Sequence, residues 1–209
     1  MKLVLASNNA KKLAELQTLF AGLPIELVNQ GALGIAEAEE PHATFVENAL
    51  AKARHAARAS GLAAIADDSG LCVAALGGAP GVQSAHYAGA VAADADREAQ
   101  RRAQDTANNA LLLESMRGVA ERRARFVCTL VALRHADDPE PLIAHRRWEA
   151  VLLSRPRGQG GFGYDPLVWI EALGASVAEL ADAQKNALSH RALAAAQMRV
   201  LMRDAWPLA

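Results

Sequence analysis

Residues 64–70, Ala-Ile-Ala-Asp-Asp-Ser-Gly, place two adjacent carboxylates directly after a short apolar run. The run 62–66 is too short for a typical helix and predicts a buried strand. A strand that ends in Asp-Asp-Ser-Gly brings acids to the edge of a sheet, where ligands bind in α/β folds. Neighbouring strand residues point to opposite faces, so we expect different roles for Asp67 and Asp68: one binds a metal or water, and the other braces a neighbour. The alternative is a turn, because Asp, Ser and Gly favour turns for local reasons.

Composition limits the class of protein. The 209 residues are 52% hydrophobic and 22% charged, which fits one large domain or one domain with two lobes. A net charge of −1 argues against nucleic-acid or anionic-membrane partners. Cys72 and Cys128 each lie in an apolar run without metal-ligand spacing, which predicts buried reduced thiols. The apolar N-terminal stretch is too short for a signal peptide and no run reaches the ~18 residues of a membrane helix, so we expect a cytoplasmic protein.

Apolar patterning predicts an alternation of strands and helices. Strands are expected at 3–6, 24–29, 62–66, 71–73, 125–134, 143–153 and 167–169. Helices are expected after residue 9, at about 44–60 and 94–117, and after Ser176 and Ser189. No internal repeat or linker is visible, so residues 1–209 are treated as a single domain.

The first strand leads into a candidate anion site. Ser7, Asn8 and Asn9 precede the first helix, where free backbone amides and the helix dipole favour an anion. Lys11 and Lys12 stand in the first turn, where the dipole disfavours cations unless an anion is bound. Neither GxxxxGK[ST] nor GxGxxG is present, so a P-loop and a dinucleotide fingerprint are absent. The alternative is an ordinary capped helix with solvated lysines.

A capping box, Thr44-Phe45-Val46-Glu47, opens a helix that is predicted to end near Ser60. Its buried stripe is predicted to comprise Val46, Leu50, Ala53 and Ala57, whereas another face carries Asn48, Lys52 and His55. Glu40 lies just before the cap, so a carboxylate and Lys52 are expected to flank one site. The alternative for the segment 37–40 is a solvated acidic loop.

Two further segments suggest ligand contacts. Residues 155–165 are rich in glycine around Phe162 and Tyr164; glycines let a backbone approach a ligand and the aromatic rings offer a stacking face. A flexible loop is the alternative. Ser189 is predicted to cap the last helix, with His190 and Arg191 in its first turn.

Together these groups suit a nucleoside triphosphate. Glu40, Asp67 and Asp68 supply oxygen ligands for Mg²⁺, the lysines suit phosphate, and an aromatic ring suits a base. No activated Ser, Cys or His nucleophile is evident, so attack by water is the simplest mechanism.

Six motifs occur in an order and at separations that resemble the inosine/xanthosine triphosphate pyrophosphatase family. They are Ser7-Asn8-Asn9 with Lys12; Thr44-Phe45-x-Glu47-Asn48-Ala49 with Lys52; Ala66-Asp67-Asp68-Ser69-Gly70; Gly77-Gly78-Ala79-Pro80-Gly81; Gly160-Gly161-Phe162-Gly163-Tyr164-Asp165-Pro166; and Lys185 with Ser189-His190-Arg191. The resemblance spans residues 3–191. The sequence differs from many relatives at Asn8, where they have glycine, and at His86, where they have arginine.

The resemblance implies a two-lobed α/β wedge around a long mixed sheet with flanking helices, an active site in the central cleft and a homodimer. It implies Mg²⁺-dependent hydrolysis of dITP, ITP or XTP to the monophosphate and pyrophosphate. Asp68 is then the proton acceptor and a metal ligand, and Glu40 is the second metal ligand. The implied substrate-binding residues are Ser7, Asn8, Asn9, Lys12, Lys52, Ser69 and Lys185 for phosphate and sugar, Phe162 for stacking, and Phe162, Gly163, Tyr164, Asp165, His190 and Arg191 around the base.

Other functions remain open at this stage. A related pyrophosphatase for modified pyrimidines would share the metal and phosphate residues but not the His190-Arg191 donors. A nucleotide-binding regulator without hydrolysis is disfavoured by the presence of both Glu40 and Asp68, and a dinucleotide-dependent oxidoreductase by the missing glycine fingerprint.

Overall fold

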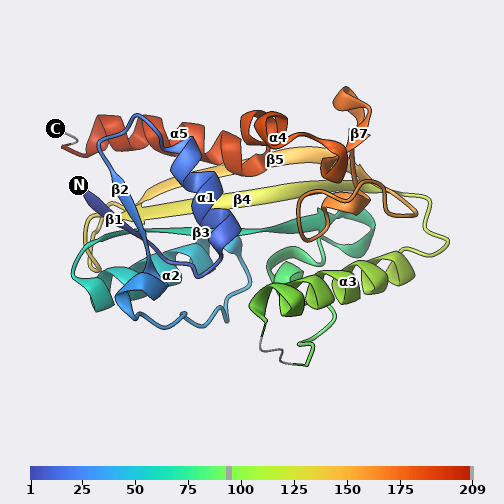
Figure 1. Cartoon of the computed structure of the whole chain (residues 1–209), viewed down its shortest axis with the longest axis horizontal. Helices are drawn as coiled ribbons and strands as arrows, with labels where there is room; N and C mark the ends of the chain where they lie inside the picture. Colours follow the sequence, from blue (N-terminus) through green and yellow to red (C-terminus); the bar gives the residue numbers. More distant parts are fainter. Residues whose placement is uncertain (93–95, 208–209) are drawn as a thin grey trace. The chain divides into compact units, whose positions relative to one another are not determined.

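The computed structural model of the chain describes residues 1–92 and 96–207. A seven-stranded mixed sheet has the strand order β2-β1-β3-β4-β5-β6-β7 (Figure 1). Strand β1 pairs in parallel with β2 and β3, whereas β6 pairs antiparallel with β5 and β7. Helices flank this sheet, so the predicted α/β class is confirmed. Within the described ranges no helix is long and apolar enough to cross a membrane.

The elements follow the predicted order closely. The strands are β1 (Lys2–Leu5), β2 (Glu26–Asn29), β3 (Ala63–Val73), β4 (Arg123–Leu133), β5 (Leu142–Leu152), β6 (Val168–Ile170) and β7 (Ala175–Ser176). The α-helices are α1 (Ala10–Leu19), α2 (Phe45–Ser60), α3 (Arg97–Ser115), α4 (Asp182–Leu188) and α5 (His190–Ala205). The predicted start of the third helix at Asp94 lies outside the described residues.

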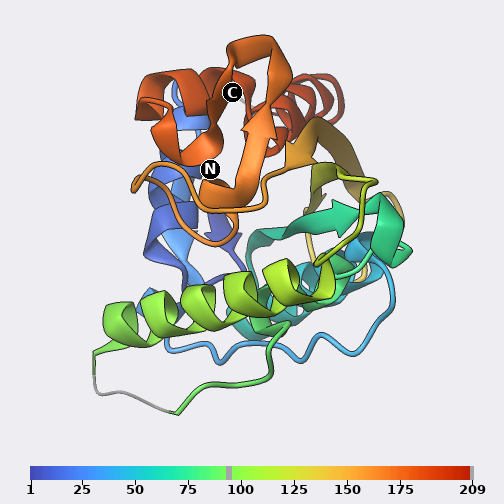
Figure 2. The ribbon, with the colours of Figure 1, turned by 90° about the vertical axis from the view of Figure 1, so that its right-hand side faces the viewer.

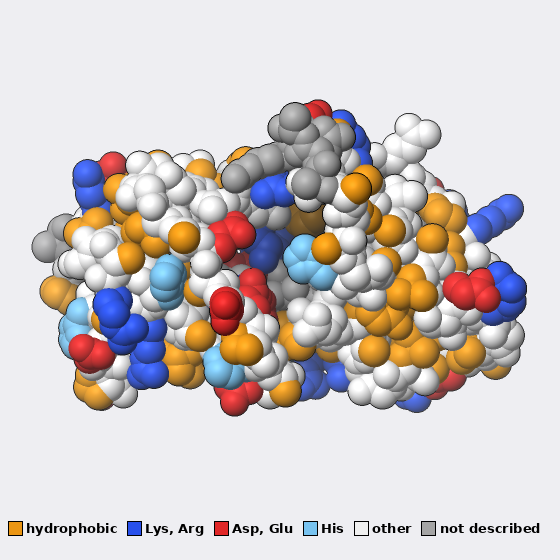
Figure 3. Space-filling view, turned by 90° about the horizontal axis from the view of Figure 1, so that it is seen from below, with side chains coloured by type: hydrophobic (Ala, Val, Ile, Leu, Met, Phe, Trp, Pro, Cys, Tyr) orange, Lys and Arg blue, Asp and Glu red, His pale blue; other side chains and the backbone are white. Residues whose placement is uncertain are grey.

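The described chain forms two compact units, each with its own core. The first comprises residues 1–68, 128–146 and the segment from 186 onward; the second comprises residues 69–127 and 147–185. Figure 3 shows one face of the molecule, on which acidic and basic side chains are interspersed, in keeping with the net charge of −1.

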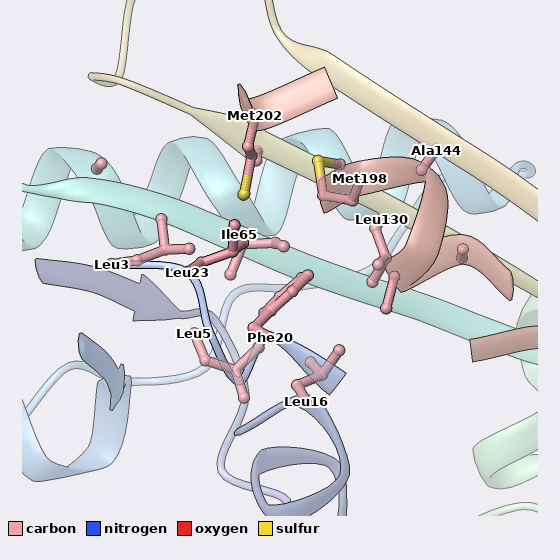
Figure 4. Close-up of a cluster of buried hydrophobic side chains, with 14 of the residues drawn as sticks. Leu3, Leu5, Leu16, Phe20, Leu23, Ile65, Leu130, Ala144, Met198 and Met202 are labelled. Atoms are coloured by element: carbon pink, nitrogen blue, oxygen red, sulfur yellow. The ribbon is translucent and has the colours of Figure 1, made fainter. Parts of the chain in front are cut away.

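In the first unit, β1 from Leu3 onward and the adjoining parts of β3 and β4 are buried on both faces. On β1 the side chains of Leu3 and Leu5 pack with α1 and α5, whereas Val4 packs with the alanine face of α2. Figure 4 shows the first of these clusters, including Phe20, which caps the C-terminus of α1, and Met198 of α5. Burial on both faces explains why these strands read as continuous apolar runs rather than alternating ones.

One local prediction was wrong and another was half right. Strand β3 does not end at the acids but continues through Asp67 and Asp68 to Val73 as one 11-residue strand, which also excludes the turn. Gly70 permits this course, because a Cβ there would lie 2.4 Å from the carbonyl oxygen of Gly81.

On α2 the predicted stripe is partly confirmed, because Ala53 and Ala57 are buried. Val46, however, is 36% exposed and Leu50 is only partly buried. The full set of buried positions is Asn48, Ala49, Lys52, Ala53, Ala56 and Ala57.

The predicted helix starts are confirmed. Asn9, Thr44 and Ser189 have extended backbones, and their side chains accept hydrogen bonds from amides of the first turns of α1, α2 and α5. The capping box at Ser176 is also present, although it opens only a short 3-10 turn, Val177–Glu179. Each cap stabilises its helix by about 1 kcal/mol.

The β4–β5 connection depends on Asp138, a buried carboxylate in the first unit. It accepts hydrogen bonds from the backbone N, Nε and Nη2 of Arg134 at 2.9, 2.8 and 2.7 Å, and from the backbone N of Glu140 at 3.0 Å. The hydrogen bonds from Arg134 are the main reason that the pKa of Asp138 lies below its ordinary value of 3.8.

We expect Asp138→Ala to lower the free energy of unfolding by about 1–3 kcal/mol at pH 7, because two backbone amides lose their acceptor. The folded-state pKa is depressed, so this contribution is present above pH ~4 and is lost as the pH falls further. Urea denaturation at pH 7 and pH 3 should therefore show a difference between wild type and variant that shrinks in acid. The neighbouring exposed acid offers the control Asp137→Asn, for which an equal loss would contradict this role of Asp138.

Candidate functional site

Glu40, Lys52 and Asp68 form a carboxylate–lysine cluster in the first unit. The Lys52 ammonium donates to Glu40 Oε2 at 2.9 Å and to Asp68 Oδ1 at 2.8 Å. Helix α2 supplies Lys52 and strand β3 supplies Asp68, while Glu40 comes from the segment before the Thr44 cap. Thus the structure brings together the three residues that the sequence placed around one site.

In this cluster the Lys52 ammonium lies between the carboxylates of Glu40 and Asp68, and all three groups are partly shielded from solvent. Burial, opposed by Lys52 and reinforced by Glu40, raises the pKa of Asp68 from 3.8 to about 6. Burial also opposes ionisation of Glu40, but Lys52 outweighs it and holds the pKa of Glu40 below its ordinary value. The Asp68 charge is therefore the less well compensated of the two.

The cluster has the donor chemistry for a hard divalent cation. Asp68 Oδ2 is buried and has no hydrogen-bond donor among the described residues. Within residues 1–92 and 96–207 no group of three or more His, Cys, Asp or Glu side chains is arranged to hold a metal. Two carboxylates nevertheless suit Mg²⁺, which commonly takes one or two protein carboxylates and completes its shell with water and substrate phosphates. Glu40 and Asp68 therefore fit the predicted metal.

Asp67 has a different environment on the opposite face of β3. Its carboxylate is 1% exposed and accepts hydrogen bonds from Lys12 Nζ and Arg191 Nε, both at 2.7 Å, and from Cys128 Sγ at 3.5 Å. Arg191 also pairs with Glu15 of α1. Burial would raise the pKa of Asp67, yet the charges of Arg191 and Lys12 hold it well below its ordinary value.

This buried ion network of Lys12, Glu15, Asp67 and Arg191 joins β3 to the first two turns of α1 and the first turn of α5. It confirms that the two adjacent aspartates differ in surroundings. It also gives Lys12 and Arg191 protein partners that the sequence did not indicate, and Arg191 is only 2% exposed. Glu15 itself carried no signal, because it reads as an ordinary charged helix residue.

The start of α1 is a capped helix. Asn9 Oδ1 accepts from the backbone amides of Lys11 and Lys12 at 3.0 and 3.2 Å, and Ser7 Oγ accepts from the Asn9 amide at 3.1 Å. These amides were expected to be available to an anion. No described residue other than glycine has a positive φ, so Asn8 adopts no left-handed conformation in place of the glycine of many relatives.

The glycine-rich segment 155–165, here called the glycine loop, lies in the second unit and is held by its own residues. Asp165 Oδ2 accepts from the Phe162 amide at 2.9 Å and from the Lys185 ammonium at 2.7 Å. The same ammonium lies 4.3 Å from the centroid of the Phe162 ring, a cation–π distance. Phe162, Asp165 and Lys185 therefore form one cluster, and Lys185 contacts a carboxylate and a ring.

The remaining predicted residues occupy distinct places. The Tyr164 hydroxyl donates to the Ser84 carbonyl at 2.9 Å, and burial raises the pKa of this phenol. Ser69 lies half-buried in β3, His190 is buried at the start of α5, and His86 is exposed at the end of the turn Gly81–His86. The contacts of Asp105 and Asn109 with Gly163 were not predicted; their i, i+4 spacing on α3 was the available signal.

Comparison with known proteins identifies the family. Residues 3–201 match the model of the Ham1 family, which is nearly the whole chain. The chain belongs to the Ham1 family. The family that the six motifs resemble is thereby confirmed, since Ham1 relatives carry the name dITP/XTP pyrophosphatase.

Similar proteins match this chain over more than nine-tenths of its length. A dITP/XTP pyrophosphatase from Methylibium petroleiphilum is 71% identical over 206 residues, 99% of each chain. One from Burkholderia pseudomallei is 60% identical over 193 residues, 92% of this chain and 89% of that one. The solved structure of a HAM1 protein from Coxiella burnetii is 41% identical and superposes with a TM-score of 0.88 over 98% of this chain and 100% of that one.

Proposed function

We propose that this Ham1 protein hydrolyses dITP, ITP and XTP to the nucleoside monophosphate and pyrophosphate. The observation that carries the proposal is the carboxylate–lysine cluster, in which Asp68 retains an unsatisfied buried oxygen beside a lysine. The names of close Ham1 relatives support the same reaction.

Glu40 and Asp68 are the proposed Mg²⁺ ligands. When bound, the metal supplies charge neutralisation at the phosphate oxygens. Lys52 stands beside both carboxylates and supplies a further positive charge. The residues proposed to bind phosphate and sugar are Ser7, Asn8, Asn9, Lys12, Ser69 and Lys185. Lys12 and Lys185 each contact a carboxylate, so each ammonium must either leave that carboxylate or contact it and the substrate together.

Asp68 is the proposed proton acceptor. Water attacks the α-phosphorus, the bond from that phosphorus to the α–β bridging oxygen breaks, and pyrophosphate leaves with that oxygen. The proton of the attacking water passes to Asp68. A pKa of about 6 in the metal-free chain leaves Asp68 ionised at neutral pH and yet close to the pH at which general bases are most effective.

Base selection is assigned to six residues. Phe162 is proposed to stack on the base, with Gly163, Tyr164, Asp165, His190 and Arg191 around its edge. Donors aimed at a 6-oxo group favour hypoxanthine and xanthine, because the 6-amino group of adenine would leave those donors unpaired. Arg191 forms buried ion pairs with Asp67 and Glu15. The proposal therefore requires its guanidinium to contact the base while it keeps these two carboxylate partners.

We also propose a homodimer as the working unit, on the basis of the family resemblance. Sedimentation equilibrium across a range of protein concentrations tests it; a mass of one chain at all concentrations would contradict it.

Pyrophosphate release across ITP, dITP, XTP, ATP, GTP, CTP and UTP tests the proposed function. We expect turnover with Mg²⁺ confined to ITP, dITP and XTP, and loss of turnover when EDTA removes the metal. Preference for another base would keep the metal and phosphate assignments but overturn the base assignment. Tight nucleotide binding without turnover on any substrate would favour a regulator instead.

A further inference from the structure

Helix α3 contacts the glycine loop through two side chains that are one helical turn apart. Asp105 Oδ2 accepts a hydrogen bond from the Gly163 amide at 2.7 Å, and Asn109 Nδ2 donates to the Gly163 carbonyl oxygen at 2.9 Å. Both backbone polar groups of one residue are thus held by one helix. These residues all belong to the second unit, and Figures 1 and 2 show α3 beneath the loop that contains Gly163.

Gly163 needs external support more than its neighbours do. Its φ of +62° lies in the left-handed region, which glycine adopts without steric cost but also leaves easily. The residues on either side have their own anchors: the Phe162 amide donates to Asp165, and the Tyr164 hydroxyl donates to Ser84. Gly163 has no side chain with which to anchor itself, so α3 sets the backbone direction between the two aromatic residues.

The helix itself is fixed by an adjacent row of side chains. Asn108 Nδ2 donates to the carbonyl oxygens of Ser84 and Ala85 at 3.2 and 3.1 Å, and Gln104 Nε2 donates to that of Gly89 at 2.7 Å. Gln104 and Asn108 are 8% and 3% exposed. These hydrogen bonds anchor α3 to the segment 84–89. The hydrogen bonds of Asp105 and Asn109 in turn fix Gly163 of the glycine loop relative to α3.

We propose that Asp105 and Asn109 form a clamp on Gly163 that positions Phe162 for stacking on the substrate base, and that both are positioning residues. This inference rests on the proposed function, because it assigns the clamp to the base-binding part of that site. The clamp contacts the backbone of Gly163, next to Phe162, so it acts chiefly on the part of the site that holds the base. Lys185, the proposed phosphate residue beside the Phe162 ring, is held separately by Asp165.

The test uses three variants of the full-length protein and a matched control. Asp105→Ala removes the acceptor for the Gly163 amide, and Asn109→Asp puts a carboxylate oxygen against the Gly163 carbonyl. Asp105→Asn keeps an acceptor oxygen and serves as the conservative rescue. The control is Thr106→Ala on the exposed side of the same helix, where the hydroxyl donates to the Arg102 carbonyl oxygen of the preceding turn.

We measure kcat and KM for dITP, and the inhibition constant of inorganic tripolyphosphate, which has no base. For Asp105→Ala and Asn109→Asp we expect kcat/KM for dITP to fall about 10-fold or more, since small misplacements of positioning groups cost up to about 10²-fold. The tripolyphosphate constant should change much less than kcat/KM for dITP. Asp105→Asn and Thr106→Ala should resemble wild type.

Ile170→Val, a core change in the second unit, supplies the comparison for simple destabilisation. Unchanged kinetics in Asp105→Ala and Asn109→Asp would overturn the inference alone. The inference would also be overturned if kcat/KM for dITP and the affinity for tripolyphosphate fell by equal factors and the thermal midpoint fell as far as in Ile170→Val, because the pair would then be merely structural. Absence of turnover by the wild-type protein on every triphosphate would overturn the proposed function, and the base-recognition role with it.

Discussion

Asp68→Asn is expected to reduce pyrophosphate release by about 10²–10⁴-fold, the usual contribution of a positioned general base. Asparagine has nearly the same shape but accepts no proton and brings no negative charge to a metal. Initial rates with dITP at saturating Mg²⁺ measure the effect. The exposed acid Asp137 provides the matched control, because Asp137→Asn removes one charge elsewhere in the same unit. Undiminished turnover in Asp68→Asn would contradict the assigned role.

The same change should not destabilise the metal-free fold. The pKa of Asp68, about 6 in the folded chain, lies above its ordinary value of 3.8, so ionisation between pH ~4 and ~6 costs stability as the pH rises. Asp68→Asn removes that cost, and we expect the free energy of unfolding above pH 6 to be unchanged or raised by up to about 2 kcal/mol. Thermal denaturation in EDTA at pH 7.5 checks this; a clear loss of stability would mean that Asp68 is chiefly structural.

Asp67→Ala is expected to lower the free energy of unfolding by about 3–5 kcal/mol, the usual cost of breaking a buried ion pair by removing one partner. The change leaves Arg191, which is 2% exposed, without the carboxylate that its Nε contacts, and Lys12 loses the same partner. Urea denaturation of Asp67→Ala and Asp68→Asn side by side gives the comparison. We expect Asp67→Ala to lower the free energy of unfolding, whereas Asp68→Asn should lower turnover without destabilising the fold.

A double-mutant cycle with Arg191→Met isolates the pair. If the buried ion pair is the cause, Asp67→Ala combined with Arg191→Met should cost less than the sum of the two single changes, because no uncompensated guanidinium remains at β3. Strictly additive losses would show that Asp67 stabilises the fold through other contacts.

Local chemistry made much of the fold predictable. Apolar runs gave the long strands, and the caps at Asn9, Thr44 and Ser189 are read directly from residue type. The end of β3 was missed because Asp-Asp-Ser-Gly has turn propensity, whereas the structure overrides it by giving each acid a cationic partner. The partly misplaced stripe on α2 has a similar origin: Lys52 is buried by its ion pairs, which an apolar pattern does not reveal.

The candidate site was predictable in its residue types but not in its pairings. Strand geometry alone indicated that Asp67 and Asp68 face opposite ways, yet only tertiary contacts show which one is neutralised by Arg191 and which retains an unsatisfied oxygen. Asp105 contacts Gly163 across 58 residues of sequence, so the i, i+4 spacing of Asp105 and Asn109 indicated a shared helix face but not what that face contacts.

Hydrolysis of dITP in H₂¹⁸O with Mg²⁺, followed by mass spectrometry of both products, tests the central claim most directly. The account predicts that one ¹⁸O atom appears in dIMP and none in pyrophosphate, because water attacks the α-phosphorus. Label in pyrophosphate or release of orthophosphate would contradict it, as would the absence of any hydrolysis.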